Sequence, residues 1–146
     1  MRERARQLIG PSAREVLICT FHALGVRILR EDGQAIGLKA QFSILDSDDV
    51  TSILKDAGAG VDAATARQWQ WSISLLKNQG LDAAKAASCA KSDHERQLAR
   101  IMARYEERLS AFQSVDFDDL IGLPPKILND HPDIRAKWQQ RFDHIL

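Results

Sequence analysis

Two short segments, far apart in the chain, carry residue types that could bind a ligand. The first is Thr20-Phe21-His22, which follows an apolar stretch and precedes a helical pattern. A threonine hydroxyl and free backbone N–H groups at a helix start can hold a phosphate, and a histidine ring can stack on a base. The same residues also suit a helix-capping threonine followed by a half-buried histidine, and the residue types alone favour this structural interpretation.

The second segment is the acidic run Asp116-Phe117-Asp118-Asp119. Clustered carboxylates can bind a divalent metal, but they also suit the first turn of a helix, where the helix dipole favours negative charge. The sequence offers no second acidic cluster beside this one. We therefore expect Asp116 to cap a helix, and we expect no metal site.

Weaker signals lie around Trp69-Gln70-Trp71 and near Gly80. Helical spacing groups Trp69 with core positions and turns Trp71 outward. Lys77 and Asn78 suit dipole and capping roles at a helix C-terminus, while an exposed tryptophan beside a lysine could support nucleic-acid binding. For Trp71 both interpretations stay open. Residues 1–30 also hold six arginines against two glutamates, an excess that could contact phosphates but more often forms a solvated face.

Several function classes lack their motifs. There is no GxxxxGK[ST] phosphate loop, no HExxH and no GxSxG, so we do not expect this chain alone to be an enzyme. Cys19 and Cys89 have no CxxC partner, which excludes a cysteine zinc site and fits a reducing cytoplasm. The formal net charge of the 146 residues is zero, so bulk charge does not indicate a nucleic-acid binder. No apolar run approaches a signal peptide core or a membrane span.

Most of the chain has helical periodicity. We expect helices over 22–30, after Asp46 or Ser47, from Asp62 to about Gly80, after Asp82, and after Ser92. The last has an S-x-x-E capping box with Glu95, followed by an apolar stripe that should be core. The stripe comprises Leu98, Ile101, Met102, Tyr105, Leu109 and Phe112.

Glycine, proline and β-branched residues predict the remaining features. Gly10-Pro11-Ser12 should end a first helix, Pro124-Pro125 should interrupt or restart the helix capped by Asp116, and Pro132 should open the last one. EVLICTF, residues 15–21, is typical of a buried parallel strand, and residues 41–45 could form a short extended piece. The final residues 144–146 resemble the start of another strand. The predicted fold is mainly α, with one or two short strands at the ends.

These segments resemble a known family. TFHALGVRILR, VDFDDLIGLP and RAKWQQRFDHIL, with the helical stretch between the first two, are similar to UvrD/Rep-type superfamily 1 ATP-dependent DNA helicases, and most of all to the Rep group. TFHALG resembles motif Ib of that family. The resemblance runs over essentially the whole chain. It implies a piece cut from a longer protein, whereas the residues alone also allow a small protein with frayed ends.

The resemblance implies a division into 1–22 and 114–146, both incomplete parts of motor domain 1A, and 23–113, the helical 1B subdomain. It implies Thr20, Phe21 and His22, and more weakly Lys77 and Asn78, as DNA contacts. Residues 116–119 would position the return into the motor domain. The parent would use ATP and Mg²⁺ to unwind DNA in the 3′ to 5′ direction during replication or repair, while this piece would lack the ATP site.

Partners implied are single-stranded and junction DNA and the other helicase domains. The orphaned end segments could also pair or self-associate. The alternative is a non-enzymatic interaction or scaffold module with little DNA affinity of its own.

Overall fold

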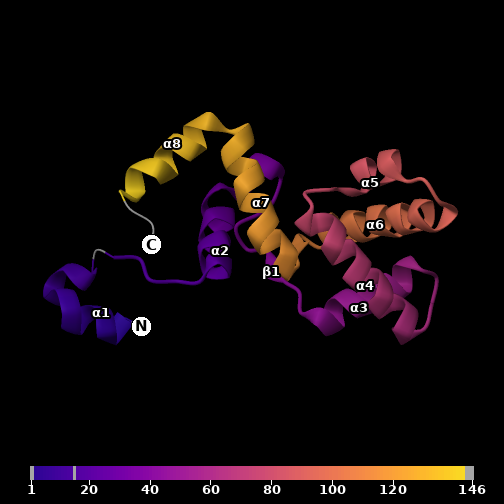
Figure 1. Ribbon diagram of the computed structural model, residues 1–146, viewed down its shortest axis with the longest axis horizontal. Helices are drawn as coiled ribbons and strands as arrows, with labels where there is room; N and C mark the ends of the chain where they lie inside the picture. Colours follow the sequence, from indigo (N-terminus) through magenta and orange to yellow (C-terminus); the bar gives the residue numbers. More distant parts are fainter. Residues whose placement is uncertain (1, 15, 144–146) are drawn as a thin grey trace.

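The computed structural model describes residues 2–14 and 16–143, and helices dominate this part of the chain (Figure 1). This confirms the mainly-α prediction. The α-helices are α1 (Arg2–Ile9), α2 (Phe21–Asp32), α3 (Ser47–Ala57), α4 (Ala63–Asn78), α5 (Ala83–Cys89), α6 (Asp93–Ala111), α7 (Phe117–Asp130) and α8 (Pro132–Arg141). Two 3₁₀ helices, η1 (Gly10–Arg14) and η2 (Gly33–Ile36), follow α1 and α2.

Side chains at the helix starts explain most of these boundaries. The N-cap residues whose side chains accept a backbone N–H are Thr20, Asp46, Asp62, Asp82, Ser92 and Asp116. Ser92 and Glu95 form the predicted capping box, and Asp116 forms another with Asp119. The predicted end of the first helix at Gly10 and the predicted start of the last helix at Pro132 are confirmed as well.

The two strands are short and lie inside the chain, not at its ends. β1 (Ser43–Ile44) pairs in parallel with β2 (Ser114–Val115). The extended piece expected at 41–45 is therefore confirmed, but the strand predicted at 15–21 is wrong. Residues 16–20 form no regular element, and Phe21 already begins α2 because Thr20 caps it. The strand start suggested at 144–146 lies outside the described residues.

The predicted interruption at Pro124-Pro125 is also wrong, because α7 runs through both prolines. Pro124 cannot donate to the carbonyl four residues earlier, that of Leu120. That carbonyl is covered by α2, where Gly25 comes so close that an added Cβ would lie 1.9 Å from the Leu120 oxygen. The tight crossing of α2 and α7 therefore lies where the helical hydrogen bond of α7 is missing.

Two apolar cores lie side by side. Helices α3 to α6, called the bundle here, enclose one core around Leu54, Ala66, Trp69, Ile73, Met102 and Tyr105. Helices α2 and α7 enclose the second, made of Leu29, Leu38, Phe42, Val115, Leu120 and Ile127. Helix α8 joins the second group, because Lys137 and Trp138 bond to Asp32 at the end of α2. Figure 1 shows α1 lying apart from both groups.

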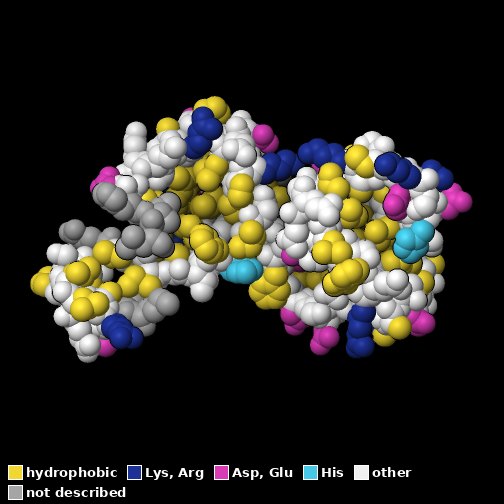
Figure 2. Space-filling model, in the orientation of Figure 1, with side chains coloured by type: hydrophobic (Ala, Val, Ile, Leu, Met, Phe, Trp, Pro, Cys, Tyr) yellow, Lys and Arg dark blue, Asp and Glu magenta, His cyan; other side chains and the backbone are white. Residues whose placement is uncertain are grey.

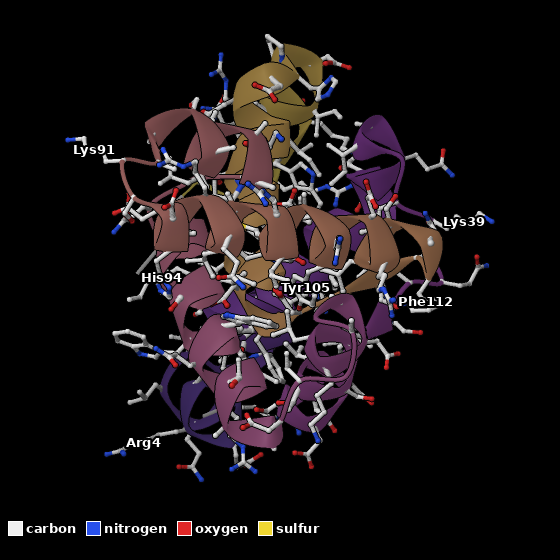
Figure 3. The ribbon with its side chains drawn as sticks, turned by 90° about the vertical axis from the view of Figure 1, so that its right-hand side faces the viewer. Arg4, Lys39, Lys91, His94, Tyr105 and Phe112 are labelled. Carbon is white, nitrogen blue, oxygen red and sulfur yellow. The ribbon has the colours of Figure 1, made fainter. Side chains whose placement is uncertain are left out.

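One residue of the predicted core stripe is misplaced. Helix α6 ends at Ala111, so Phe112 caps it from outside and is 63% exposed. Figure 3 shows Tyr105 in the middle of α6 and Phe112 at its end. The other stripe residues are buried or packed against the bundle core.

Candidate nucleic-acid interface

The first candidate segment forms the exposed start of α2. Thr20 Oγ1 accepts the backbone N–H of Ala23 at 3.2 Å, so the threonine is a helix cap. Phe21 is 77% exposed and His22 is also exposed, although a half-buried histidine was the structural expectation. The segment therefore presents an aromatic ring and an imidazole to solvent at a helix N-terminus.

The second segment meets the first. The ring of Phe117, at the start of α7, forms a T-shaped pair with His22, with 6.1 Å between ring centroids and 78° between ring planes. Phe117 is 56% exposed. We call Phe21, His22 and Phe117 the aromatic surface. Figure 2 shows exposed hydrophobic side chains over this part of the molecule.

The three residues reach this surface because α2 and α7 pack along one another (Figure 1). Segments far apart in the sequence are thus brought together at the starts of two helices. Aromatic and imidazole rings can stack on bases, and the free N–H groups at a helix N-terminus can donate hydrogen bonds to phosphate oxygens. The arrangement is suited to single-stranded nucleic acid.

Lys77 lies behind this surface in a buried polar cluster. Its Nζ is 2.7 Å from Asp116 Oδ2 and 2.9 Å from Asp119 Oδ1, and its side chain is 11% exposed. Tyr105 donates its hydroxyl to Asp116 Oδ2 at 2.8 Å. We call these four residues the Lys77 clamp. It joins α4 and α6 of the bundle to the first turn of α7.

The clamp holds two carboxylates against one ammonium group, so their pKa values move apart. Burial raises the pKa of Asp119 to about 6, although the Lys77 charge opposes this. Burial also acts to raise the pKa of Asp116, but Lys77 and the Tyr105 hydroxyl outweigh it and lower that pKa below 3.8. Burial lowers the pKa of Lys77 and the two carboxylates raise it, with a net rise.

Lys77 and Asn78, the weaker predicted DNA contacts, lie at the end of α4. Asn78 is exposed, whereas the Lys77 ammonium is engaged by both carboxylates. The structure thus brings His22, the chain neighbour of Thr20 and Phe21, beside Phe117. Lys77 bonds to the aspartates that precede and follow Phe117 in the chain. The DNA-contact roles themselves stay predictions.

The acidic run acts as a cap in the structure. Asp116 and Asp119 accept each other's backbone N–H in the capping box and also bind Lys77. Among the described residues, no group of three or more His, Cys, Asp or Glu side chains could hold a metal ion. Likewise, no helix in the described ranges is long and apolar enough to cross a membrane.

The remaining candidates lie on other faces. Trp69 is buried, whereas Trp71 is exposed on α4 together with Leu75. Arg30 of α2 donates to the Ala40 carbonyl and lies over the Phe42 ring, 5.0 Å from its centroid. That guanidinium therefore packs on the second core.

Sequence reasoning missed two features of this site. We expected Tyr105 only as a residue of the apolar core. No sequence pattern indicates that its hydroxyl donates a hydrogen bond to Asp116. The burial of Lys77 does have a signal, because Trp69, Ile73 and Lys77 are spaced four residues apart and therefore share one helix face. A lysine on a core-facing stripe indicates a buried ion pair.

Comparison with known proteins adds an independent line of evidence. A family model described as UvrD/REP helicase N-terminal domain matches residues 1–146. The ATP-dependent DNA helicase PcrA of Leuconostoc citreum is 37% identical over 150 residues, covering 99% of this chain and 20% of that protein. The ATP-dependent DNA helicase Rep of Salmonella typhimurium is 35% identical over 150 residues, covering all of this chain and 22% of that protein.

A third relative is the ATP-dependent DNA helicase UvrD1 of Mycobacterium tuberculosis. It is 37% identical over 154 residues, covering all of this chain and 20% of that protein. The chain therefore spans about a fifth of the length of the curated relatives it matches.

Proposed function

Because this chain belongs to the UvrD/REP helicase N-terminal domain family, we propose that it is part of an ATP-dependent DNA helicase. Its own share of the work is to supply DNA-binding surface. The observation that carries this proposal is the meeting of two motif segments in one exposed aromatic surface, where the His22 and Phe117 rings form a T-shaped pair.

The surface fits single-stranded DNA better than duplex. Phe21 and Phe117 expose flat apolar rings, on which unpaired bases can stack whatever their sequence, at about 1–3 kcal/mol per base. The first turn of α2 offers backbone N–H groups beside them, which can meet a phosphate. In this proposal Thr20, Phe21, His22 and Phe117 form the contact set, and exposed Asn78 extends it. Lys77 is left out, because its charge is already neutralised.

The proposed parent couples this surface to ATP hydrolysis elsewhere. ATP and Mg²⁺ are proposed for that parent from the family resemblance. In this chain the carboxylates of Asp116 and Asp119 are engaged by Lys77 and by their own cap. The division into 1–22, 23–113 and 114–146 remains part of the proposal. The end of α6 at Ala111 supports the boundary between 113 and 114. The boundary between 22 and 23 fits less well, because α2 packs with α7 of the return segment. Unwinding of junction DNA in the 3′ to 5′ direction, a role in replication or repair, and a cytoplasmic location are also proposals.

The test is fluorescence anisotropy of labelled single-stranded and forked DNA against this chain at about 50 and 200 mM salt. We expect weak binding, in the micromolar range or weaker, that loosens further at the higher salt. Phe21→Ala and His22→Ala should each weaken it about three- to tenfold. Phe112→Ala is the control, because Phe112 is also mostly exposed, at 63% against 77% for Phe21, but caps the C-terminal end of α6 and is not part of the aromatic surface.

Equal losses in Phe21→Ala and Phe112→Ala would contradict the proposed surface. Absence of binding by the unaltered chain at low salt would instead favour the scaffold alternative. One observation supports an interaction role of that kind: Trp71 and Leu75 are both exposed, one turn apart on α4. A partner helix could cover such a pair.

The N-terminal end supports a further proposal of self-association. Leu8, Ile9 and Val16 are exposed apolar side chains near one another in the chain. Pairing between two copies would cover them. Sedimentation of the chain over a range of concentrations should show a dimer that a Leu8→Glu/Ile9→Glu variant loses, and a monomer at every concentration would contradict this.

A further inference from the structure

The Lys77 clamp lies at the junction of the two apolar cores. Lys77 comes from α4 and Tyr105 from α6, both in the bundle core, whereas Asp116 and Asp119 belong to the first turn of α7. Phe117 lies between those two aspartates in the chain. Any shift of the α7 first turn therefore moves the Phe117 ring.

No other described ion pair joins the bundle to α7. The ion pairs of Lys137 and Arg141 connect α8 to α2, and that of Arg108 connects α6 to α3. The clamp thus adds polar bonds to the packing of α4 against α7.

We propose that Lys77 is a positioning residue, which holds the first turn of α7 from the bundle and thereby keeps Phe117 against His22 in the aromatic surface. Its effect on DNA binding rests on the proposed function, whereas its effect on the His22–Phe117 geometry does not. Lys77 itself touches no DNA in this account. It transmits the position of the bundle to the surface through Asp116 and Asp119.

The chain offers a matched control for this role. Lys137 also bridges two carboxylates, those of Glu31 and Asp32, at 3.1 and 2.6 Å. It joins α8 to α2, away from the α7 first turn. Lys77→Met and Lys137→Met each remove one ammonium group from two acidic partners, but only the first should disturb Phe117.

The experiment measures two quantities on the whole chain. The first is the NMR shift of the His22 ring protons, which the nearby ring of Phe117 perturbs, with Phe117→Ala giving the value for an absent ring. The second is affinity for single-stranded DNA by anisotropy. In Lys77→Met we expect the His22 shift to move toward the Phe117→Ala value and the affinity to fall about threefold or more. Lys137→Met should leave both unchanged, and Lys77→Arg should restore most of the shift.

Lys77→Met leaves two buried carboxylates without their cation and could unfold the chain. The double variant Lys77→Met/Asp119→Asn avoids this, because Asp116 keeps its Tyr105 and backbone donors. A folded Lys77 variant whose His22 shift matches the unaltered chain would overturn the positioning role. A moved shift without any DNA binding by the unaltered chain would support the positioning role and contradict the proposed function.

Discussion

At the scale of single residues, the main feature is the unequal pair of carboxylates at the start of α7. Asp116 receives the Tyr105 hydroxyl in addition to Lys77, so it is the better-supported anion. Asp119 shares the same ammonium without that donor. As pH falls, Asp119 is therefore the first of the two carboxylates to take up a proton.

This difference predicts an unusual dependence of stability on pH. The pKa of Asp119 is raised from 3.8 to about 6 by burial, so between these values the folded chain holds a proton that the unfolded chain has released. The free energy of unfolding should therefore fall as pH rises from about 4 to about 6, by about 1–3 kcal/mol. Urea unfolding across this range should show the decline, and Asp119→Asn should remove it.

Glu31 gives the opposite slope at lower pH. A hydrogen bond from Arg141 lowers the pKa of Glu31 from 4.5 to about 2, so the stabilisation from this pair is lost as pH falls through that interval. Stability should thus peak near pH 4. A profile of Asp119→Asn that still declines above pH 4 would mean that another group titrates there.

The Tyr105 hydroxyl gives a second residue-scale prediction. Tyr105→Phe removes the donor to Asp116 Oδ2 but keeps the ring in the bundle core. We expect a loss of about 1–2 kcal/mol, because a buried carboxylate loses one of its partners. Chemical denaturation measures this, and titration of the Asp116 carboxyl by NMR should show its pKa rising. If neither the free energy of unfolding nor the pKa of Asp116 changes, water has replaced the hydroxyl.

At the scale of elements, the crossing of α2 and α7 decides how the site is built. Gly25 allows the α2 backbone to lie against the Leu120 carbonyl, which Pro124 has left without its helical partner. A glycine in one helix and a proline in the other are thus complementary features of a single close approach. This contact sets where the two helix starts, and hence His22 and Phe117, come together.

The crossing predicts opposite results for two glycine substitutions. Gly25→Ala would place a methyl group on the Leu120 carbonyl and should cost about 3 kcal/mol or more. Gly122→Ala, on an open side of α7, should stabilise the chain by about 0.5–1 kcal/mol, since alanine favours helix. Thermal unfolding of both variants tests this, and a tolerated Gly25→Ala would contradict the close approach.

The sequence predicted elements well wherever the signal was local. Capping residues such as Asp62 and Ser92 defined helix starts because their hydrogen bonds reach only three residues along the chain. Prediction from the sequence failed where contact with a distant segment of the chain determines the local structure. Residues 15–21 have strand-like composition, yet a strand needs a partner. Pro124 is typical of a helix break, yet α7 continues through it where α2 packs closely against it. The meeting of His22 with Phe117 is long-range in the same way, and no local pattern predicts it.

At the scale of the whole molecule, α1 contributes little to the two cores. It packs chiefly on the neighbouring η1 segment, with Leu8 largely exposed. Removing residues 1–14 should therefore leave the midpoint of thermal unfolding within about 2 °C of the intact chain. Differential scanning calorimetry measures this, and sedimentation of the same shortened chain should show loss of self-association. A large drop in the midpoint would place α1 in the cooperative core.

The pairing of β1 with β2 has a consequence for how such a molecule can change. Parallel neighbours cannot be joined by a tight hairpin, so some crossover must connect them, and here the entire bundle serves as that connection. For the strand pairing, the chain need only leave along one strand and return along the other. The bundle can therefore be enlarged or trimmed away from α7, as long as Lys77 and Tyr105 still reach the first turn of that helix.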